Sequence, residues 1–77
     1  MHRLERARQL LGSEPSEALR LAESVSSTEV VEERELIAMD ALHRLGRADA
    51  LRERGQRFIE RFPRSLYAER VRRWLRP

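Results

Sequence analysis

Helix-breaking residues interrupt this chain at four places, and a helical pattern resumes within a few residues each time. Gly12, the serines around Ser26, Gly46 and Pro63 mark the four breaks. Glycine often follows the last turn of a helix, clustered serines compete for backbone hydrogen bonds, and a proline pushes the preceding residue out of the α region. Loops of about two to five residues force neighbouring helices to reverse direction and touch. The breaks therefore predict a run of short antiparallel helices.

Apolar side chains recur at helical spacing between these breaks. In the longest segment, Ala38, Ala41, Leu42 and Leu45 share one face. The two-residue alternation that is typical of a strand is missing from the sequence. We therefore expect an all-α fold of about five helices, over residues 3–11, 15–25, 29–45, 48–62 and 65–75.

Small polar residues precede several of these segments. Serine and threonine side chains accept hydrogen bonds from the first free N–H groups of a helix, and proline fits the first turn because its missing N–H has no partner there. Pro15 is therefore expected in the first turn of the second helix. The expected N-caps are Ser13 or Ser16 for the second helix, Ser27 or Thr28 for the third, and Ser65 for the fifth.

Length and charge set further limits. With 77 residues, of which 40% are apolar and 38% charged, the chain is expected to form one small domain with an ion-covered exterior. All sixteen basic residues are arginines. Residues 1–35 carry eight acids and five arginines, whereas residues 36–77 carry five acids and eleven arginines, so net charges of −3 and +6 add to +3. Such asymmetry favours an anionic partner or attraction between the two halves.

Little in the sequence suggests catalysis, a metal or a cofactor. The histidines are His2, near the end of the chain, and His43, on a charged helix face; the serines are explained as caps, and no Gly-x-Ser-x-Gly turn is present. Cysteine is absent, which excludes disulfides and thiolate metal sites. No apolar run approaches the ~20 residues of a membrane span, and no apolar signal core stands near residue 1. We expect a non-enzymatic chain without cofactors that, as given, is cytoplasmic.

The span 32–65 resembles a tetratricopeptide repeat, a family of paired helices with a 34-residue period. Leu45 and Gly46 stand where that family turns between its helices, and Pro63 stands at its closing proline. The residues at its inward positions are Ala38, Met39, Leu42, Leu51 and Phe58. The segment FPRSLYAERVRRWL resembles a junction common in bacterial repeat proteins of this type.

This resemblance implies a stack of hairpins with a concave face formed by the first helix of each. The hairpins would be residues 1–26 and 29–62, with residues 65–75 as a C-terminal capping helix of a single domain over 1–77. The chain departs from the family pattern at Glu35, Ala48 and Gly55, where larger apolar or aromatic residues are usual.

The function that this resemblance implies is a non-catalytic interaction or scaffold module. Its partner would be a peptide, a helix or another protein, with a second copy of the chain as a close variant. Leu36, outside the main apolar stripe, would offer an apolar contact among charges, and Tyr67 and Trp74 are typical of binding hot spots. The candidate partner-binding residues are Glu33, Leu36, Asp40, His43, Arg44, Tyr67 and Trp74.

An Arg-rich nucleic-acid-binding domain is the alternative function. Arginines recur along the fourth helix and continue into the fifth, and such a stripe would neutralise phosphates. Glu53, Glu60 and Glu69 interrupt the positive charge, and exposed aromatic residues for stacking bases are few. The candidate residues for this alternative are Arg54, Arg57, Arg61, Arg64, Arg70 and Arg73.

Overall fold

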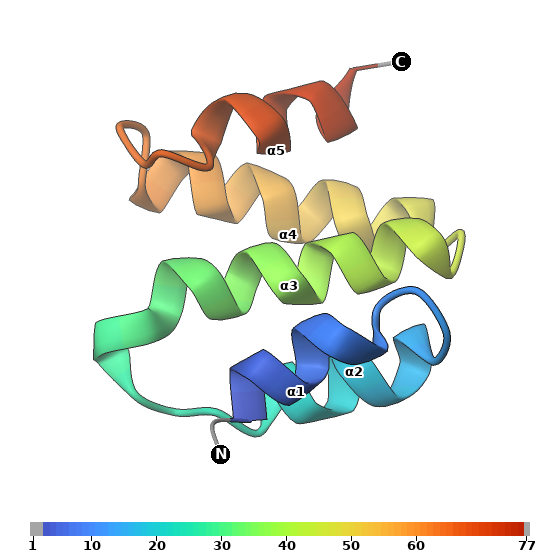
Figure 1. The fold of residues 1–77 in the computed structure, drawn as a ribbon. Coiled ribbons are helices and arrows are strands. Elements are labelled where there is room, and N and C mark those ends of the chain that lie inside the picture. The colour runs from blue at the N-terminus through green and yellow to red at the C-terminus, as the bar shows by residue number, and fades with distance from the viewer. Residues whose placement is uncertain (1–2, 77) are drawn as a thin grey trace.

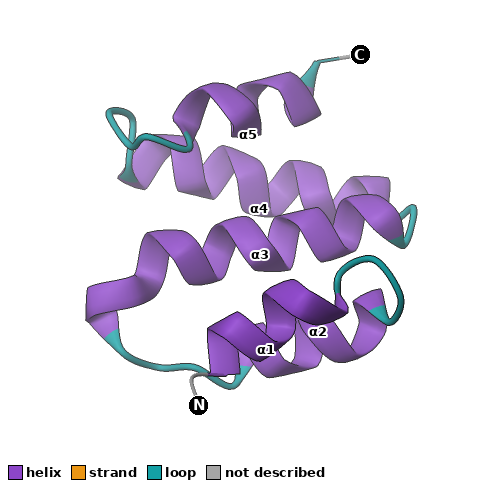
Figure 2. Cartoon of the chain, viewed as in Figure 1, coloured by secondary structure: helices purple, strands orange, loops and turns teal. Residues whose placement is uncertain are grey.

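Five α-helices make up most of the computed structural model, which describes residues 3–76. They are α1 (Arg3–Leu10), α2 (Pro15–Glu23), α3 (Val31–Arg44), α4 (Ala48–Arg61) and α5 (Ala68–Leu75), with a 3₁₀ turn, η1 (Thr28–Val30), before α3. Within residues 3–76 there is no strand, so the all-α prediction is confirmed (Figure 2). His2 lies outside the described residues.

The local signals for helix ends are confirmed at several positions. Pro15 opens α2. The hydroxyl of Ser27 accepts a hydrogen bond from the N–H of Glu29, but it caps η1 and not α3, whose N-cap residue is Val30. Gly46 closes the α3–α4 turn with a φ of +72°, a left-handed conformation in which a Cβ would be strained. The N-cap expected at Ser13 or Ser16 is wrong, because Glu14 occupies that position and makes no side-chain cap.

The junction between α4 and α5 differs from the expectation. Pro63 ends α4 after Arg61 as predicted, but α5 begins at Ala68 instead of just after Ser65. The hydroxyl of Ser65 accepts a hydrogen bond from the N–H of Tyr67, 3.0 Å away. Ser65 therefore holds a tight turn of its own, and the helix starts only after that turn is complete.

The helices are arranged in two layers. In Figure 1 the chain reverses direction at each connection, and α2 lies behind α1 while α4 lies behind α3 and α5. The molecule measures 32 × 27 × 16 Å, and the shortest dimension fits two layers with axes about 8–10 Å apart. Tetratricopeptide-like stacking of these hairpins stays a prediction.

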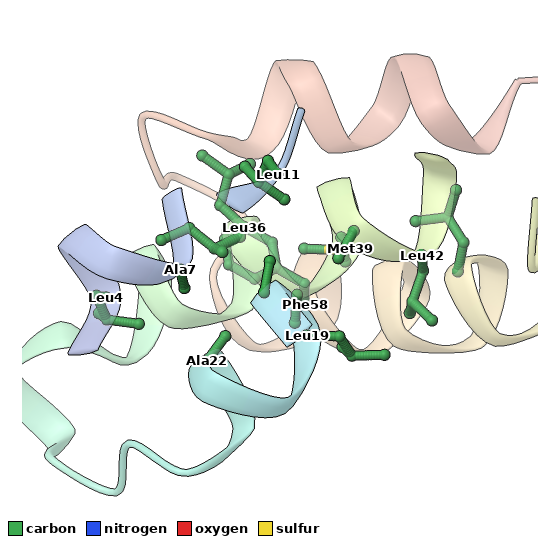
Figure 3. Packing of buried hydrophobic residues seen from close by; sticks show 14 of the residues in the cluster. Leu4, Ala7, Leu11, Leu19, Ala22, Leu36, Met39, Leu42 and Phe58 are labelled. Carbon is green, nitrogen blue, oxygen red and sulfur yellow. The ribbon is translucent and has the colours of Figure 1, made fainter. Parts of the chain in front are cut away.

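Helix α3 occupies the centre of the hydrophobic core. Every residue from Leu36 to Leu42 is buried, because α1, α2 and α4 all pack against this helix. Figure 3 shows Leu36 and Met39 among side chains from the neighbouring helices, including Leu11, Leu19 and Phe58.

Helix α5 joins the core by a close approach to α4. Val71 is fully buried against this helix, and Gly55 of α4 is buried beneath it. A Cβ at Gly55 would lie 2.9 Å from Cδ2 of Leu75 and 3.3 Å from Cγ1 of Val71. Gly55, a departure from the repeat pattern, is thus the residue that lets α5 pack tightly.

Candidate partner-binding face

A groove crosses the face formed by α1, α3 and α5. Its volume is about 310 Å³, and its floor includes Leu11, Leu36 and Ile37. Charged side chains from all three helices surround this floor: Arg8 of α1, Asp40 and Arg44 of α3, and Arg70 of α5. We call this feature the Asp40 groove.

Asp40 is the buried charge at the centre of this groove. Only 7% of the residue is exposed. Its Oδ1 accepts a hydrogen bond from Nε of Arg44 at 2.8 Å, and its Oδ2 accepts one from Nη2 of Arg70 at 3.2 Å. Asp40 and Arg44 are four residues apart, so both side chains lie on the same side of α3. One carboxylate between two half-exposed guanidinium groups leaves a net positive charge and several N–H donors beside the groove.

Arg70 also connects the Asp40 groove with the aromatic side chains of the same face. Its guanidinium carbon lies 5.3 Å from the centre of the Trp74 ring, within the range of a cation–π interaction. The ring of His43 lies on Trp74 with 6.0 Å between the centroids. The salt bridge of Arg70 with Asp40 and the contact of Trp74 with His43 thus tie α5 to α3, and the cation–π contact within α5 joins the two.

A second pocket opens on the far side of this aromatic pair. It has a volume of about 500 Å³ and lies between the α3–α4 turn and the end of α5. Leu42, Leu51 and Leu75 form its apolar part. Among residues 3–76, the remaining lining residues include no carboxylate: they are His43, Gly46, Arg47, Ala48, Arg52, Trp74 and Arg76. We call it the basic pocket.

The structure brings five of the seven predicted partner-binding residues to these two hollows. Asp40, Arg44 and Leu36 line the Asp40 groove, and His43 and Trp74 line the basic pocket. The expectation that Leu36 lies outside the core is wrong. It is 8% exposed, because α1 covers this side of α3 (Figure 3).

Glu33 and Tyr67 lie elsewhere. The carboxylate of Glu33 accepts a hydrogen bond from Arg8 of α1, and this bond is the main reason that the pKa of Arg8 is raised. Tyr67 is half-buried and packs against the hydrophobic core. Neither lines the Asp40 groove or the basic pocket.

On the opposite face, Arg54 of α4 binds two carboxylates. Its Nε and Nη2 donate to Glu35 of α3 at 2.8 and 3.1 Å, and its Nη1 donates to Glu23 of α2 at 2.8 Å. Burial disfavours the charge on Glu35, but the hydrogen bonds and charge of Arg54 outweigh this effect and lower the pKa of Glu35. Burial likewise opposes the charge of Arg54, but its hydrogen bonds to Glu35 and Glu23 outweigh it and raise the pKa of Arg54. We call Glu23, Glu35 and Arg54 the Arg54 cluster.

The six arginines of the nucleic-acid alternative do not form one free stripe. Arg54 is bound within the Arg54 cluster and Arg70 is bound to Asp40. Arg57 and Arg61 lie along α4 and Arg64 follows in the next loop, while Arg73 is exposed on α5. Part of the positive surface expected for this alternative is therefore already neutralised.

Other classes of site find no support in residues 3–76. No three histidine, aspartate or glutamate side chains there converge on a point where a metal ion could bind. Within the same range, none of the helices combines the length and apolarity needed to cross a bilayer.

Comparisons with family models, curated proteins and solved structures find no match to this chain. The resemblance to tetratricopeptide repeats therefore stays a prediction from the residues quoted above.

Five arginines of this face were not predicted as partner-binding residues. Arg70 was considered only as a phosphate contact, although its position four residues before Trp74 places both on one side of a helix. Arg8 binds Glu33, which is twenty-five residues away, and no local sequence pattern predicts that contact. Arg47, Arg52 and Arg76 meet at the basic pocket only because α5 folds back over α4.

Proposed function

We propose that this protein is a non-catalytic interaction module that docks an extended or helical segment of another protein on the α1/α3/α5 face. The observation that supports this function is the row formed by Asp40, Arg70, Trp74 and His43, with a hollow on each side. Tryptophan and arginine are the side chains that most often dominate binding energy at protein interfaces.

The charges on this face select the chemistry of the partner. The Asp40 groove is lined by three arginines and one aspartate, and the basic pocket is lined by three more arginines. Three of these six arginines also have a carboxylate partner outside the two hollows: Arg8 with Glu33, Arg52 with Asp49 and Arg76 with Glu69. An acidic segment with one or two bulky apolar side chains would pair its carboxylates with these guanidinium groups and place its apolar side chains over the leucines of the basic pocket. The partner would thus be an acidic, amphipathic peptide.

Selection from a random peptide library on the immobilised chain tests this proposal. Acidic peptides with apolar anchors should be enriched, and their binding should change the fluorescence of Trp74, the single tryptophan of the chain. In Arg70→Ala we expect the affinity to fall about tenfold, equivalent to about 1.4 kcal/mol. His43→Ala should also lower the affinity for the selected peptides.

Arg57→Ala is the matched control, because it removes an exposed arginine of α4 that lines neither the Asp40 groove nor the basic pocket. Selected peptides that bind Arg70→Ala and His43→Ala as tightly as the unchanged chain would overturn the proposal. Sequence-independent binding of RNA or DNA that is lost between low and moderate salt would instead support the nucleic-acid alternative.

A further inference from the structure

One large apolar side chain stands almost fully in solvent. Leu66, in the loop between α4 and α5, is 97% exposed and is the only large hydrophobic residue within 3–76 with this property. Arg61 and Arg64 line the hollow beside it. Arg72 approaches the same loop and donates a hydrogen bond to the carbonyl oxygen of Pro63 at 3.4 Å. We call Leu66, Arg61 and Arg64 the Leu66 patch.

A hollow of complementary character lies where α1 meets the connection between α2 and α3. It has a volume of about 380 Å³. Its apolar part consists of Leu4, Val25 and Val30, and its charged residues are Glu5, Glu29 and Glu33 with Arg3, so three carboxylates stand against one guanidinium. We call it the acidic hollow.

Both features lie at the same end of the helices. In Figure 1 the α4–α5 loop and the connection between α2 and α3 lie at the left edge of the molecule. Glu32, in the first turn of α3, lines the hollow beside Leu66, whereas Glu29 and Glu33 line the acidic hollow. The start of α3 therefore separates the two features.

We infer that two copies of this chain associate through this edge, with Leu66 of each copy in the acidic hollow of the other. A two-fold axis between the patch and the hollow exchanges them, so both contacts form at once and the assembly closes as a dimer. Each contact buries a leucine against leucine and valine side chains and brings Arg61 and Arg64 to Glu5 and Glu29. Opposite charges at such a rim favour the matching partner and its orientation.

Charge reversal in separate chains tests this pairing. One variant, Arg61→Glu with Arg64→Glu, has an acidic patch and an acidic hollow. The other, Glu5→Arg with Glu29→Arg, has a basic patch and a basic hollow. In sedimentation velocity over a concentration series, the unchanged chain should dimerise, each variant alone should be monomeric, and an equimolar mixture should dimerise because both contacts are attractive again.

Leu66→Glu supplies the control for general attraction between oppositely charged chains. Because Leu66 is exposed, this change should leave the helical circular dichroism intact. It should weaken dimerisation about 100-fold in the unchanged chain, and it should abolish association when placed in both charge-reversed chains.

Three results would overturn the inference. They are a chain that stays monomeric at millimolar concentration, a dimer that tolerates Leu66→Glu, and a mixture of the charge-reversed chains that stays monomeric. Binding of the monomer to vesicles of anionic lipid, lost in Leu66→Glu, would assign the Leu66 patch to a membrane surface instead. Glu5 pairs with Arg8 of the Asp40 groove, so peptide binding is measured in the Arg61→Glu, Arg64→Glu chain and in Leu66→Glu, whose residues line neither the Asp40 groove nor the basic pocket. The proposed function is thus tested separately.

Discussion

The two faces of this protein combine arginine and carboxylate side chains in opposite proportions. The Arg54 cluster places one arginine between two carboxylates, and three of its nitrogens donate hydrogen bonds to them. The Asp40 groove places one carboxylate between two arginines, which keep further N–H donors at the surface. The first arrangement uses all three nitrogens of one arginine and joins α2, α3 and α4, whereas the second uses one nitrogen from each of two arginines and lies beside hollows. We therefore expect the Arg54 cluster to contribute more to stability, whereas recognition is the role that we propose for the Asp40 groove.

Removal of Arg54 should have the largest effect. Arg54→Met keeps the aliphatic part of the side chain but leaves Glu35, whose side chain is 17% exposed, with Arg34 at 3.3 Å as its remaining partner. We expect the free energy of unfolding to fall by about 3 kcal/mol, measured by urea denaturation followed by circular dichroism. Arg57→Met removes an exposed ion pair with Glu53, in which the two atoms lie 3.7 Å apart. It should lower the free energy of unfolding by no more than about 0.5 kcal/mol. Equal losses in the two variants would refute the structural role of the Arg54 cluster.

Acid should weaken the same cluster. The pKa of Glu35 is lowered in the folded state from its ordinary value of 4.5. Its contribution is therefore complete above about pH 4.5 and is lost as the pH falls through the lower, folded-state pKa. Glu35→Gln should cost about 1.5 kcal/mol at neutral pH. Unfolding curves at several pH values should show this difference shrinking below pH 4.5, and a constant difference would contradict the linkage.

Loss of the Asp40 charge should matter less. Asp40→Asn keeps a hydrogen-bond acceptor for Arg44 or Arg70, and both arginines can turn towards water because about half of each side chain is exposed. We expect a loss of about 1 kcal/mol in the free energy of unfolding. A loss as large as that of Arg54→Met would mean that the two faces do not differ in role.

The smallest change in stability is expected for Arg70→Ala. Its partly exposed contacts with Asp40 and Trp74 should contribute about 0.5 kcal/mol. Because the guanidinium lies over the indole ring, the emission spectrum of Trp74 should nevertheless shift. Arg73→Ala removes an exposed neighbour with no recorded contact to the indole and serves as the control. An unchanged spectrum in Arg70→Ala would remove the cation–π contact from the proposed binding face.

Local features of this fold could be read from the sequence. The positive φ at Gly46, the opening of α2 at Pro15 and the pair of Asp40 with Arg44 each depend on residues within one helical turn. The start of α5 was placed three residues too early, because Ser65 is equally suited to a free turn and to an N-cap.

The tertiary contacts could not be read in the same way. Glu35 and Gly55 are departures from the repeat pattern, yet one binds Arg54 and the other lets α5 approach α4. Leu36 is buried because α1 covers α3, a fact that the apolar stripe of α3 alone does not contain. The pair of Arg70 with Asp40 joins residues thirty positions apart. Such pairs depend on how helices are placed in space, which periodicity does not specify.

The thinness of the molecule has a mechanical consequence. Because only two layers of helices span its 16 Å, α3 contributes side chains to both ionic clusters. Asp40 and Glu35 lie on different sides of this fourteen-residue helix, where Asp40 binds Arg70 of α5 and Glu35 binds Arg54 of α4. We therefore expect a displacement of α3 to disturb both ionic clusters together.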